Sequence, residues 1–596
     1  MPHRTATLLW RAFLATALVC AVGLLPWLSH TDPALTVLKA RSAERDPDPE
    51  VLAAVRSQLA LDNGPLRLLG QWLGGLPRGD AGRSWISGAE VMPGVLQALG
   101  ASLLLMGAAL AVAVVTTGLV CARTLWQGGR AMERSGGDES GLLGVVGELL
   151  ARRSGGTGSA VLAALPEFLT ASVLASVVGV QLGWLPALGW YGPRWTVLPA
   201  LALGLPAGAV MGRLLDDLLP GAFAEPWARA AAARGLSGRR IARQAVRRCL
   251  PGLLPNMGLF VVGLTGGAVA VEQIYDIPGL GRTTLQAALA QDLPVLQAGT
   301  LALLLLAAVA AGLTRLAARL LVGPALHADA LPSLHGPTTS TARRTLPLVY
   351  GAVLLGVVAL GLPRDPLALN TGLRLQHPSW THPFGTDALG RDLLARVAHG
   401  AVDTLLLALA ISAVALAAGV LLGLLPRLSG PLVDTVNAVP PVLAALLITA
   451  VAGNGTATPA LAVTALAWTP LAAHTSALLR HERATLHVTA TRGLGASRWH
   501  ILRHELLPAV LPPVTRHALL RLPGIALALA SLGFLGLGAQ PPSPEWGLLL
   551  AENQPYAERA PWAVLAPAAV LVLLGALAVT AAGGVRATGQ RELAAR

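Results

Sequence analysis

The stretch Trp227-Ala-Arg-Ala-Ala-Ala-Ala-Arg-Gly235-Leu-Ser-Gly-Arg-Arg-Ile-Ala-Arg243 decides how the rest of this chain is interpreted. A second stretch has the same pattern: Val488-Thr-Ala-Thr-Arg-Gly-Leu-Gly495-Ala-Ser-Arg-Trp-His-Ile-Leu-Arg-His504. Each has small residues, then Gly followed by Leu-Ser or Ala-Ser, then a basic amphipathic turn that runs on to Leu-Pro. Each lies between long apolar runs, and the shared pattern indicates that the chain consists of two related halves.

The composition is that of a membrane protein. Of 596 residues, 54% are hydrophobic and 13% are charged, whereas a soluble globular chain has roughly 25% charged residues. Many apolar runs approach 20 residues, the length that crosses a bilayer as a helix. Because hydrocarbon cannot satisfy backbone amides, each span must be helical. The sequence therefore predicts an all-α polytopic membrane protein.

Twelve spans are predicted, six in each half. The N-terminal apolar run is interpreted as the first span, since no small-residue cleavage site follows it and further spans do. In the first half the spans are roughly 10–28, 96–121, 158–182, 195–212, 253–272 and 295–322. In the second half they are roughly 345–363, 404–425, 435–452, 458–479, 517–538 and 561–583.

The halves repeat in parallel. In each, one span opens at a proline (Pro166-Glu167 in the first half and Pro440-Pro441 in the second), a further span follows, and then the basic loop. Parallel repeats predict a pseudo-two-fold axis along the membrane normal, with a pathway between the halves. The predicted division is 1–322 for the first half, 323–344 for a polar cytoplasmic linker, and 345–596 for the second half.

The distribution of arginine predicts the orientation. Segment 213–252 has eight arginines against three acidic residues, and 480–516 has six against two. Segment 535–561 has three glutamates and one arginine. The positive-inside rule places both basic loops, the linker and both termini in the cytoplasm. The net charge of +13 is thus interpreted as a topology signal and not as a sign of nucleic-acid binding.

The two loops resemble the cytoplasmic "EAA" coupling loop of ABC importer permeases, and the resemblance covers nearly the whole chain. The first half resembles the B-type permease of dipeptide, oligopeptide and nickel importers in the motifs Trp72-Leu-Gly-Gly-Leu-Pro-Arg-Gly-Asp-Ala-Gly-Arg-Ser84 and Val271-Glu-Gln-Ile-Tyr-Asp-Ile-Pro-Gly-Leu-Gly-Arg282. The second half resembles the C-type partner in His382-Pro-Phe-Gly-Thr-Asp-Ala-Leu-Gly-Arg-Asp392 and Leu532-Gly-Phe-Leu-Gly-Leu-Gly-Ala-Gln-Pro-Pro-Ser-Pro-Glu-Trp-Gly547.

The resemblance implies a type I importer permease that forms the pathway, with two ABC ATPase subunits or domains and an outer solute-binding protein as partners. It implies dipeptides or oligopeptides as substrates, with nickel or a metal chelate as the alternative. Arg229 and Thr489 stand where the family pattern often has Glu. The coupling loops are about 225–251 and 484–508, and the residues expected to meet the ATPases are Arg229, Ala230, Ala231, Arg234, Gly235, Ser237, Thr489, Ala490, Arg492, Gly495 and Ser497.

The sequence suggests no catalytic, metal or cofactor site. Its one lysine, Lys39, does not end the Gly-rich loop that a Walker A motif needs. ATP is therefore expected to be bound and hydrolysed by separate partner subunits. Cys20, Cys121 and Cys249 suggest neither a disulfide framework nor a metal cluster.

Other interpretations remain open at this point. A secondary transporter would need buried coupling-ion ligands and would leave the two loops unexplained, and a membrane scaffold or receptor would leave the parallel repeat unexplained. Ionisable residues inside spans usually have a function. Glu167 is the candidate pathway residue, with Asp403 and Asp434 as further candidates; alternatively, all three are solvated or paired with arginine at span ends.

Overall fold

In the part of the chain that the computed structural model describes, the regular secondary structure is helical. The isolated β-bridges Arg83–Glu90 and Thr386–Asp392 are the exceptions. The predicted linker 323–344 lies outside the described residues except for its last three. The structure describes residues 2–28, 34–35, 38, 49–58, 64–135, 156–322, 342–425, 430, 432–433, 435–437, 439–453, 455 and 457–594.

Each of the twelve predicted spans coincides with a helix or, once, with a bent pair of helices, which confirms the predicted fold class. Seven helices have the length and composition to cross a bilayer, a bent pair is an eighth, and three shorter apolar helices and α12 account for the rest. In chain order the helices are α1 (Pro2–Gly23), α6 (Val91–Ser135), α8 (Gly156–Ala164) with α9 (Glu167–Leu174), α10 (Pro193–Ala224), α12 (Gly238–Ile274), α14 (Leu293–Val322), α15 (Ala342–Gly361), α16 (Leu393–Gly423), α18 (Pro441–Ala452), α19 (Ala457–Arg483), α22 (Leu507–Phe534) and α24 (Pro561–Ala594).

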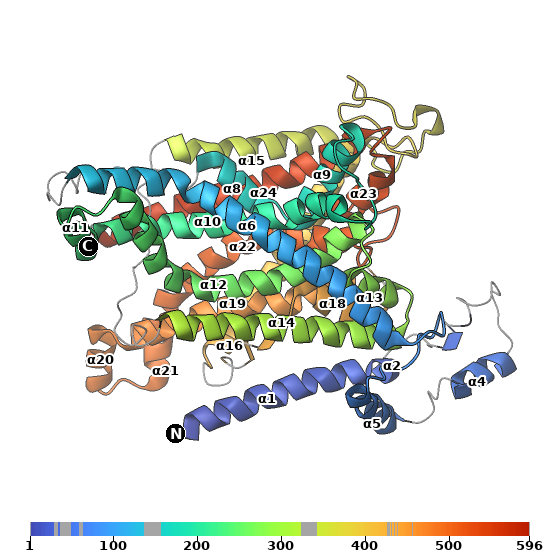
Figure 1. The fold of residues 1–596 in the computed structure, drawn as a ribbon, viewed down its shortest axis with the longest axis horizontal. Helices are drawn as coiled ribbons and strands as arrows, with labels where there is room; N and C mark the ends of the chain where they lie inside the picture. Colours follow the sequence, from blue (N-terminus) through green and yellow to red (C-terminus); the bar gives the residue numbers. More distant parts are fainter. Residues whose placement is uncertain are drawn as a thin grey trace.

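Short helices cover the two ends of this bundle (Figure 1). At one end lie α2 (Leu25–Leu28), α4 (Pro49–Gln58), α5 (Pro65–Gly75), α13 (Leu280–Leu289) and α23 (Trp546–Asn553). At the other end lie α11 (Pro226–Ala233), α20 (Leu486–Gly493) and α21 (Arg498–Ile501). The basic loops are thus separated from the remaining short helices by the length of the bundle.

The third span differs from the prediction of one helix over 158–182. Between α8 and α9 the direction changes by 107°, and residues 175–181 form a π-helix. The bend lies at Pro166, whose φ of −64° and ψ of 151° are extended. Proline cannot donate the helical hydrogen bond and disfavours helix in the residue before it. Pro440 has nearly the same conformation, with φ −62° and ψ 145°, where α18 begins.

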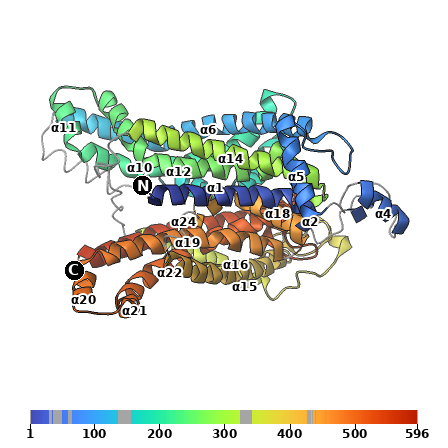
Figure 2. The ribbon, with the colours of Figure 1, turned by 90° about the horizontal axis from the view of Figure 1, so that it is seen from below.

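The two halves interlock through these proline-initiated helices. In the first half, α8 and α9 pack on α24 of the second, while α18 of the second half packs on α12 and α13 of the first. The rings of Phe168 on α9 and Phe534 on α22 have centroids 5.7 Å apart. Figure 2 shows the two halves as two layers of helices, blue to green and yellow to red, that face each other. One hydrophobic core therefore spans both halves.

Within the first half, α6 and α10 approach each other closely through glycine. Gly204, Gly208 and Gly212 recur every four residues on α10 and so share one face of the helix. A Cβ atom added at Gly208 would lie 2.5 Å from the carbonyl oxygen of Ala113, which is closer than atoms can pack. Small residues at this spacing let membrane helices bring their backbones together.

We expect Gly208→Leu to lower the free energy of unfolding by about 2 kcal/mol or more, because a side chain forces α6 and α10 apart. The matched control is Gly221→Leu on the same helix, where no atom lies within 4 Å of an added Cβ. Denaturant titration of both variants in detergent measures the difference. Equal losses at the two positions would contradict the close approach.

Candidate functional site

Both predicted coupling loops lie at one end of the bundle and on opposite sides of it (Figures 1 and 2). The first consists of α11 and the start of α12. The second consists of α20, α21 and a π-helical turn over 502–506 that leads into α22. Each loop is a short helix, a turn, and then the helix that forms the fifth span of its half. The shared sequence pattern therefore corresponds to a shared backbone structure.

The same turn ends the short helix in both loops. Gly235 and Gly495 have φ of +72° and +88°, a region that costs other residues about 1 kcal/mol or more. The N–H of each glycine donates to the carbonyl three residues earlier, at 2.9 and 3.0 Å, and the next N–H donates to the carbonyl five residues earlier, at 3.1 and 3.3 Å. These bonds define a Schellman motif. Two residues after each glycine, Ser237 and Ser497 are N-cap residues of α12 and α21.

A small hydrophobic core supports the first loop. It joins α6, α10, α11 and α12 and includes Met132, Phe223, Ala228 and Ile241. The helix α6 has 45 residues, against 31 in its second-half counterpart α16, and its additional turns reach the loop. There Glu133 accepts a hydrogen bond from the N–H of Gly238 at 3.3 Å. The first loop is therefore positioned by the rest of its own half.

The second loop exposes apolar side chains. Val488 is the buried residue of α20, whereas Leu486, Leu494 and Trp499 are 88%, 89% and 67% exposed. Exposed arginines, including Arg492, lie in the same loop. A surface that combines exposed large apolar side chains with positive charge is typical of a protein interaction site.

Most of the predicted contact residues lie on the surface of the loops. Arg229 and Ala231 are partly buried. The others are exposed: Ala230, Arg234, Gly235, Ser237, Thr489, Ala490, Arg492, Gly495 and Ser497. Because the loops lie on opposite sides of the bundle (Figure 2), the structure forms two separate surfaces from these residues and not one.

The candidate pathway residue Glu167 lies where the halves meet. It begins α9 at the break in the third span and is partly exposed. Its side chain faces α12, since a Cβ added at Gly267 would lie 3.0 Å from the Glu167 carboxyl carbon. Asp403 is exposed on α16, which packs mainly on second-half helices. Asp434 lies outside the described residues.

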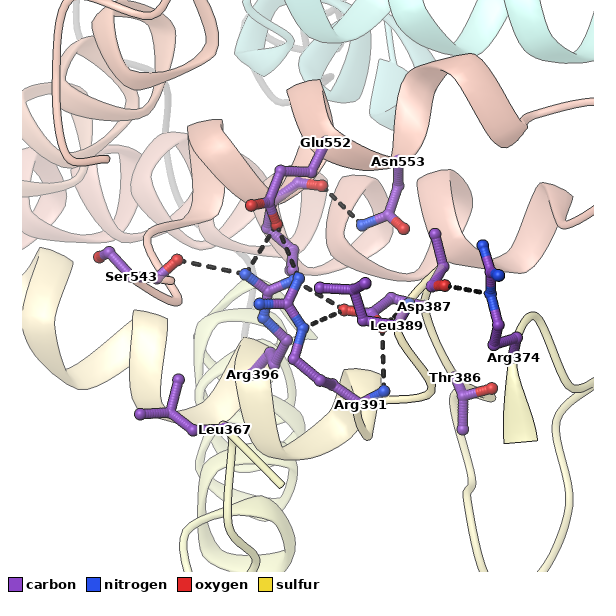
Figure 3. A network of polar contacts seen from close by, with 12 residues as sticks. Leu367, Arg374, Thr386, Asp387, Leu389, Arg391, Arg396, Ser543, Glu552 and Asn553 are labelled. Carbon is purple, nitrogen blue, oxygen red and sulfur yellow. Dashed lines mark hydrogen bonds and ion pairs between the residues drawn. The ribbon is translucent and has the colours of Figure 1, made fainter. Parts of the chain in front are cut away.

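A network of mostly buried charges (Figure 3) fixes the end of the second half that lies opposite the loops (Figure 1). Asp387 accepts from Arg391 Nε at 2.7 Å and from Arg396 Nη1 at 2.9 Å. Glu552 on α23 accepts from Nη2 of the same arginines, at 3.2 and 2.8 Å. The side chain of Arg396 is 0% exposed, and it also donates to the Ser543 carbonyl at 3.2 Å. Two carboxylates thus balance two guanidinium groups, as buried charges require.

In the first half, hydrogen bonds to a single carboxylate stand in the place of this charge network. Asp292, between α13 and α14, accepts hydrogen bonds from the Ser84 hydroxyl and from the Trp85 N–H, the latter at 3.0 Å. In both halves these interactions join the segment before the second span to the segment before the sixth. The end of each half opposite the loops is therefore held together by contacts between segments far apart in the sequence.

A further buried carboxylate positions α23. Glu545 is its N-cap residue and accepts from the N–H groups of Gly547 and Leu548 at 2.9 and 2.8 Å. Burial raises the pKa of the Glu545 carboxyl to about 7, although both hydrogen bonds favour the charged form. The network helix α23 is thus fixed at its start by Glu545 and near its end by Glu552.

Sequence reasoning finds only part of this network. It singles out the motif His382–Asp392 through the family resemblance, and within that motif the Asp387 carboxylate accepts from the N–H groups of Leu389 and Arg391. It misses Arg396 and Glu552. An arginine at the start of an apolar span was the available signal, but its partner lies on a helix that the sequence does not place beside it.

The repeated helical bundle, with a matching loop in each half, defines a polytopic membrane permease. The family model for the "binding-protein-dependent transport system inner membrane component" matches residues 151–323 and 406–585. The chain belongs to this family, and it carries the family domain twice.

Relatives found among known proteins include proteins named as permeases of peptide transport systems. The di/tripeptide transport system permease protein DppC of Pseudomonas aeruginosa is 37% identical over 208 residues, covering 33% of this chain and 69% of the relative. A protein of Escherichia coli named as a probable D,D-dipeptide transport system permease, DdpC, is 35% identical over 202 residues, covering 32% and 67%. A protein of Brucella abortus named as a peptide transport system permease is 30% identical over 313 residues, covering 49% and 90%. Each match covers most of the relative and at most half of this chain, which agrees with a fusion of two permease domains.

We expect Asp387→Asn to lower the free energy of unfolding by about 3–5 kcal/mol, because it leaves two buried arginines with one carboxylate. Adding Arg396→Met should recover part of that loss, since it restores the charge balance. Asp365→Asn, at an exposed acid of the same loop, is the control. Thermal unfolding in detergent measures all three, and no difference between Asp387→Asn and the control would refute the role of the network.

Proposed function

We propose that this chain supplies both membrane-spanning halves of an ATP-driven ABC importer for dipeptides or oligopeptides. The observation that carries this proposal is the coupling-type loop, which occurs twice with the same glycine turn. The twofold family match and the peptide-transport names of the relatives support it. The pathway then runs between the halves, along the pseudo-two-fold axis.

In this proposal ATP hydrolysis comes from separate partners. Two ATPase subunits or domains dock on the two loops, and closure of the ATPase dimer around ATP rotates the halves against each other. A solute-binding protein delivers substrate at the opposite end. The chain itself is not an enzyme and holds no cofactor, in keeping with the sequence around Lys39.

The relatives favour peptides over the alternative substrates. The three relatives described above are named for peptides and not for nickel or a metal chelate. The family description also names a binding-protein-dependent system, which favours an ABC importer over a secondary transporter. No observation on the described residues favours a second function.

We further propose that the end carrying the loops is cytoplasmic. The arginine excess of 213–252 and 480–516 supports this orientation. The N-terminus and the end of α24 lie at the same end of the bundle as the loops (Figure 1). The hydrogen bonds of Asp292 and the Asp387 charge network then lie on the outer side of the membrane, where the binding protein docks.

Gly235→Asp and Gly495→Asp are expected to abolish ATP-dependent uptake and to weaken retention of the ATPase subunits. Each glycine is exposed, has positive φ and has no atom within 4 Å of an added Cβ, so strain within the chain costs only about 1 kcal/mol. A complete loss of uptake and of ATPase retention must therefore come from a disturbed contact with the ATPase, and not from strain within this chain. The measurement is peptide uptake by proteoliposomes, together with ATPase recovery in pull-downs.

Gly64→Asp is the matched control, because Gly64 also has positive φ (+76°) and open space around it. It is the N-cap residue of α5, which lies at the opposite end of the bundle (Figure 1). Wild-type uptake and full ATPase recovery in both loop variants would show that the loops do not couple transport to ATP. Concentrative uptake by the wild-type chain without any added ATPase would show that hydrolysis does not require a partner.

Orientation is tested by labelling with a membrane-impermeant thiol reagent on intact cells. In a background without Cys20, Cys121 and Cys249, Glu558→Cys should be labelled and Ala484→Cys should not. Both positions are exposed in the structure, so that access differs by the side of the membrane. Permeabilised cells, in which both should react, provide the control, and the reverse pattern on intact cells would invert the topology.

A further inference from the structure

The surroundings of Glu167 place its side chain between the halves. Just before it, the carbonyl oxygen of Ala164 lies against α24 of the second half, since a Cβ added at Gly575 would be 2.6 Å away. Just after it, the ring of Phe168 packs against the ring of Phe534 of the second half. These flanking contacts join the halves on both sides of Glu167, and Glu167 itself is partly exposed. Glu167 therefore lies between the halves with part of its surface accessible.

The residue of α12 that faces the Glu167 carboxylate is a glycine. On α12, Gly267 faces Glu167, and a Cβ added at the neighbouring Gly266 would lie 3.2 Å from Pro440 Cβ of the second half. Within the described part of the chain, the hydrogen bond assigned to the carboxylate comes from the N–H of Glu167 itself, and no ion pair to it is found. Glu167 is thus an acidic side chain without a counter-ion at the junction of the halves.

The acidic side chain of Glu167 has no counterpart at the matching position of the second half. Pro166 and Pro440 have the same extended conformation at the start of α9 and α18, and the residue that follows is Glu167 in the first half but Pro441 in the second. Among the described residues, the acidic side chain at this proline break is therefore present in one half and not in the other. An ionisable side chain in a membrane span typically marks a substrate pathway.

We propose that Glu167 binds the N-terminal ammonium group of the peptide as it passes between the halves. This inference rests on the proposed function. A peptide importer must accept many side chains, and the ammonium group is a feature that unblocked peptides share. One carboxylate can bind one ammonium group, which leaves the side chains of the peptide free to vary.

A purely structural role for Glu167 would make a different prediction. Acidic residues in the first turn stabilise helices, so the carboxylate could serve α9 alone. In that case its replacement would impair every substrate equally. Binding of the ammonium group instead predicts that the effect depends on the charge of the substrate, and this dependence separates the two roles.

The test is a cycle of one protein change and one substrate change. Uptake of an unblocked dipeptide and of its N-acetyl derivative is measured for the wild type and for Glu167→Gln, in proteoliposomes that contain the ATPase subunits and the binding protein. Each rate is normalised to the fraction of binding protein loaded, because that protein has its own preference. Binding-protein-stimulated ATP hydrolysis is measured in parallel to report on assembly.

We expect Glu167→Gln to reduce uptake of the unblocked peptide about tenfold or more, the usual size of a charge-assisted hydrogen bond, and to leave uptake of the acetylated peptide unchanged. Glu167→Asp should retain part of the preference, and Asp403→Asn, an exposed acid on a helix that packs mainly on the second half, should retain all of it. An equal effect of Glu167→Gln on both peptides would overturn the inference. Absence of peptide uptake by the wild type with its ATPases would instead refute the proposed function.

Discussion

A peptide group in hydrocarbon has no water to bond with, and this constraint organises the whole molecule. It makes every span helical and permits a broken helix only where protein or a water-filled space surrounds the break. The two proline breaks, at Pro166 and Pro440, lie at the contact between the halves, where α9 faces α22 and α24, and α18 faces α12 and α13. The position of the breaks therefore identifies the surface between the halves, and the one acidic residue at a break, Glu167, lies on that surface.

The halves share a backbone plan but stabilise it by different means. At one end of the bundle both loops turn through a glycine at positive φ, yet the first rests on the long helix α6 and a small core, while the second exposes Leu486, Leu494 and Trp499. At the opposite end the first half uses Asp292 with neutral donors, and the second uses four charged side chains, three of them buried. A duplicated architecture has thus kept its geometry while its contacts diverged.

The sequence predicts the features that depend on local pattern. Apolar runs predict the spans, the arginine excess predicts which loops share a side, and the Gly-x-Ser spacing predicts the turns at Gly235 and Gly495. It does not predict contacts between distant segments. The bend at Pro166 was missed because a proline near a span end need not break the helix, and the pairing of Arg396 with Glu552 depends on how α16 and α23 pack. The role of Glu167 depends likewise on which residues of the other helices approach its carboxylate in the folded chain.

The central claim is that one chain provides both halves of a transport pathway. Native mass spectrometry of the complex, purified with its ATPase subunits, tests this claim most directly because it counts the copies of each chain. The account predicts one copy of this chain with two ATPase subunits or domains. A complex with two copies of this chain around one ATPase dimer would contradict it, since each chain would then contribute only part of the pathway.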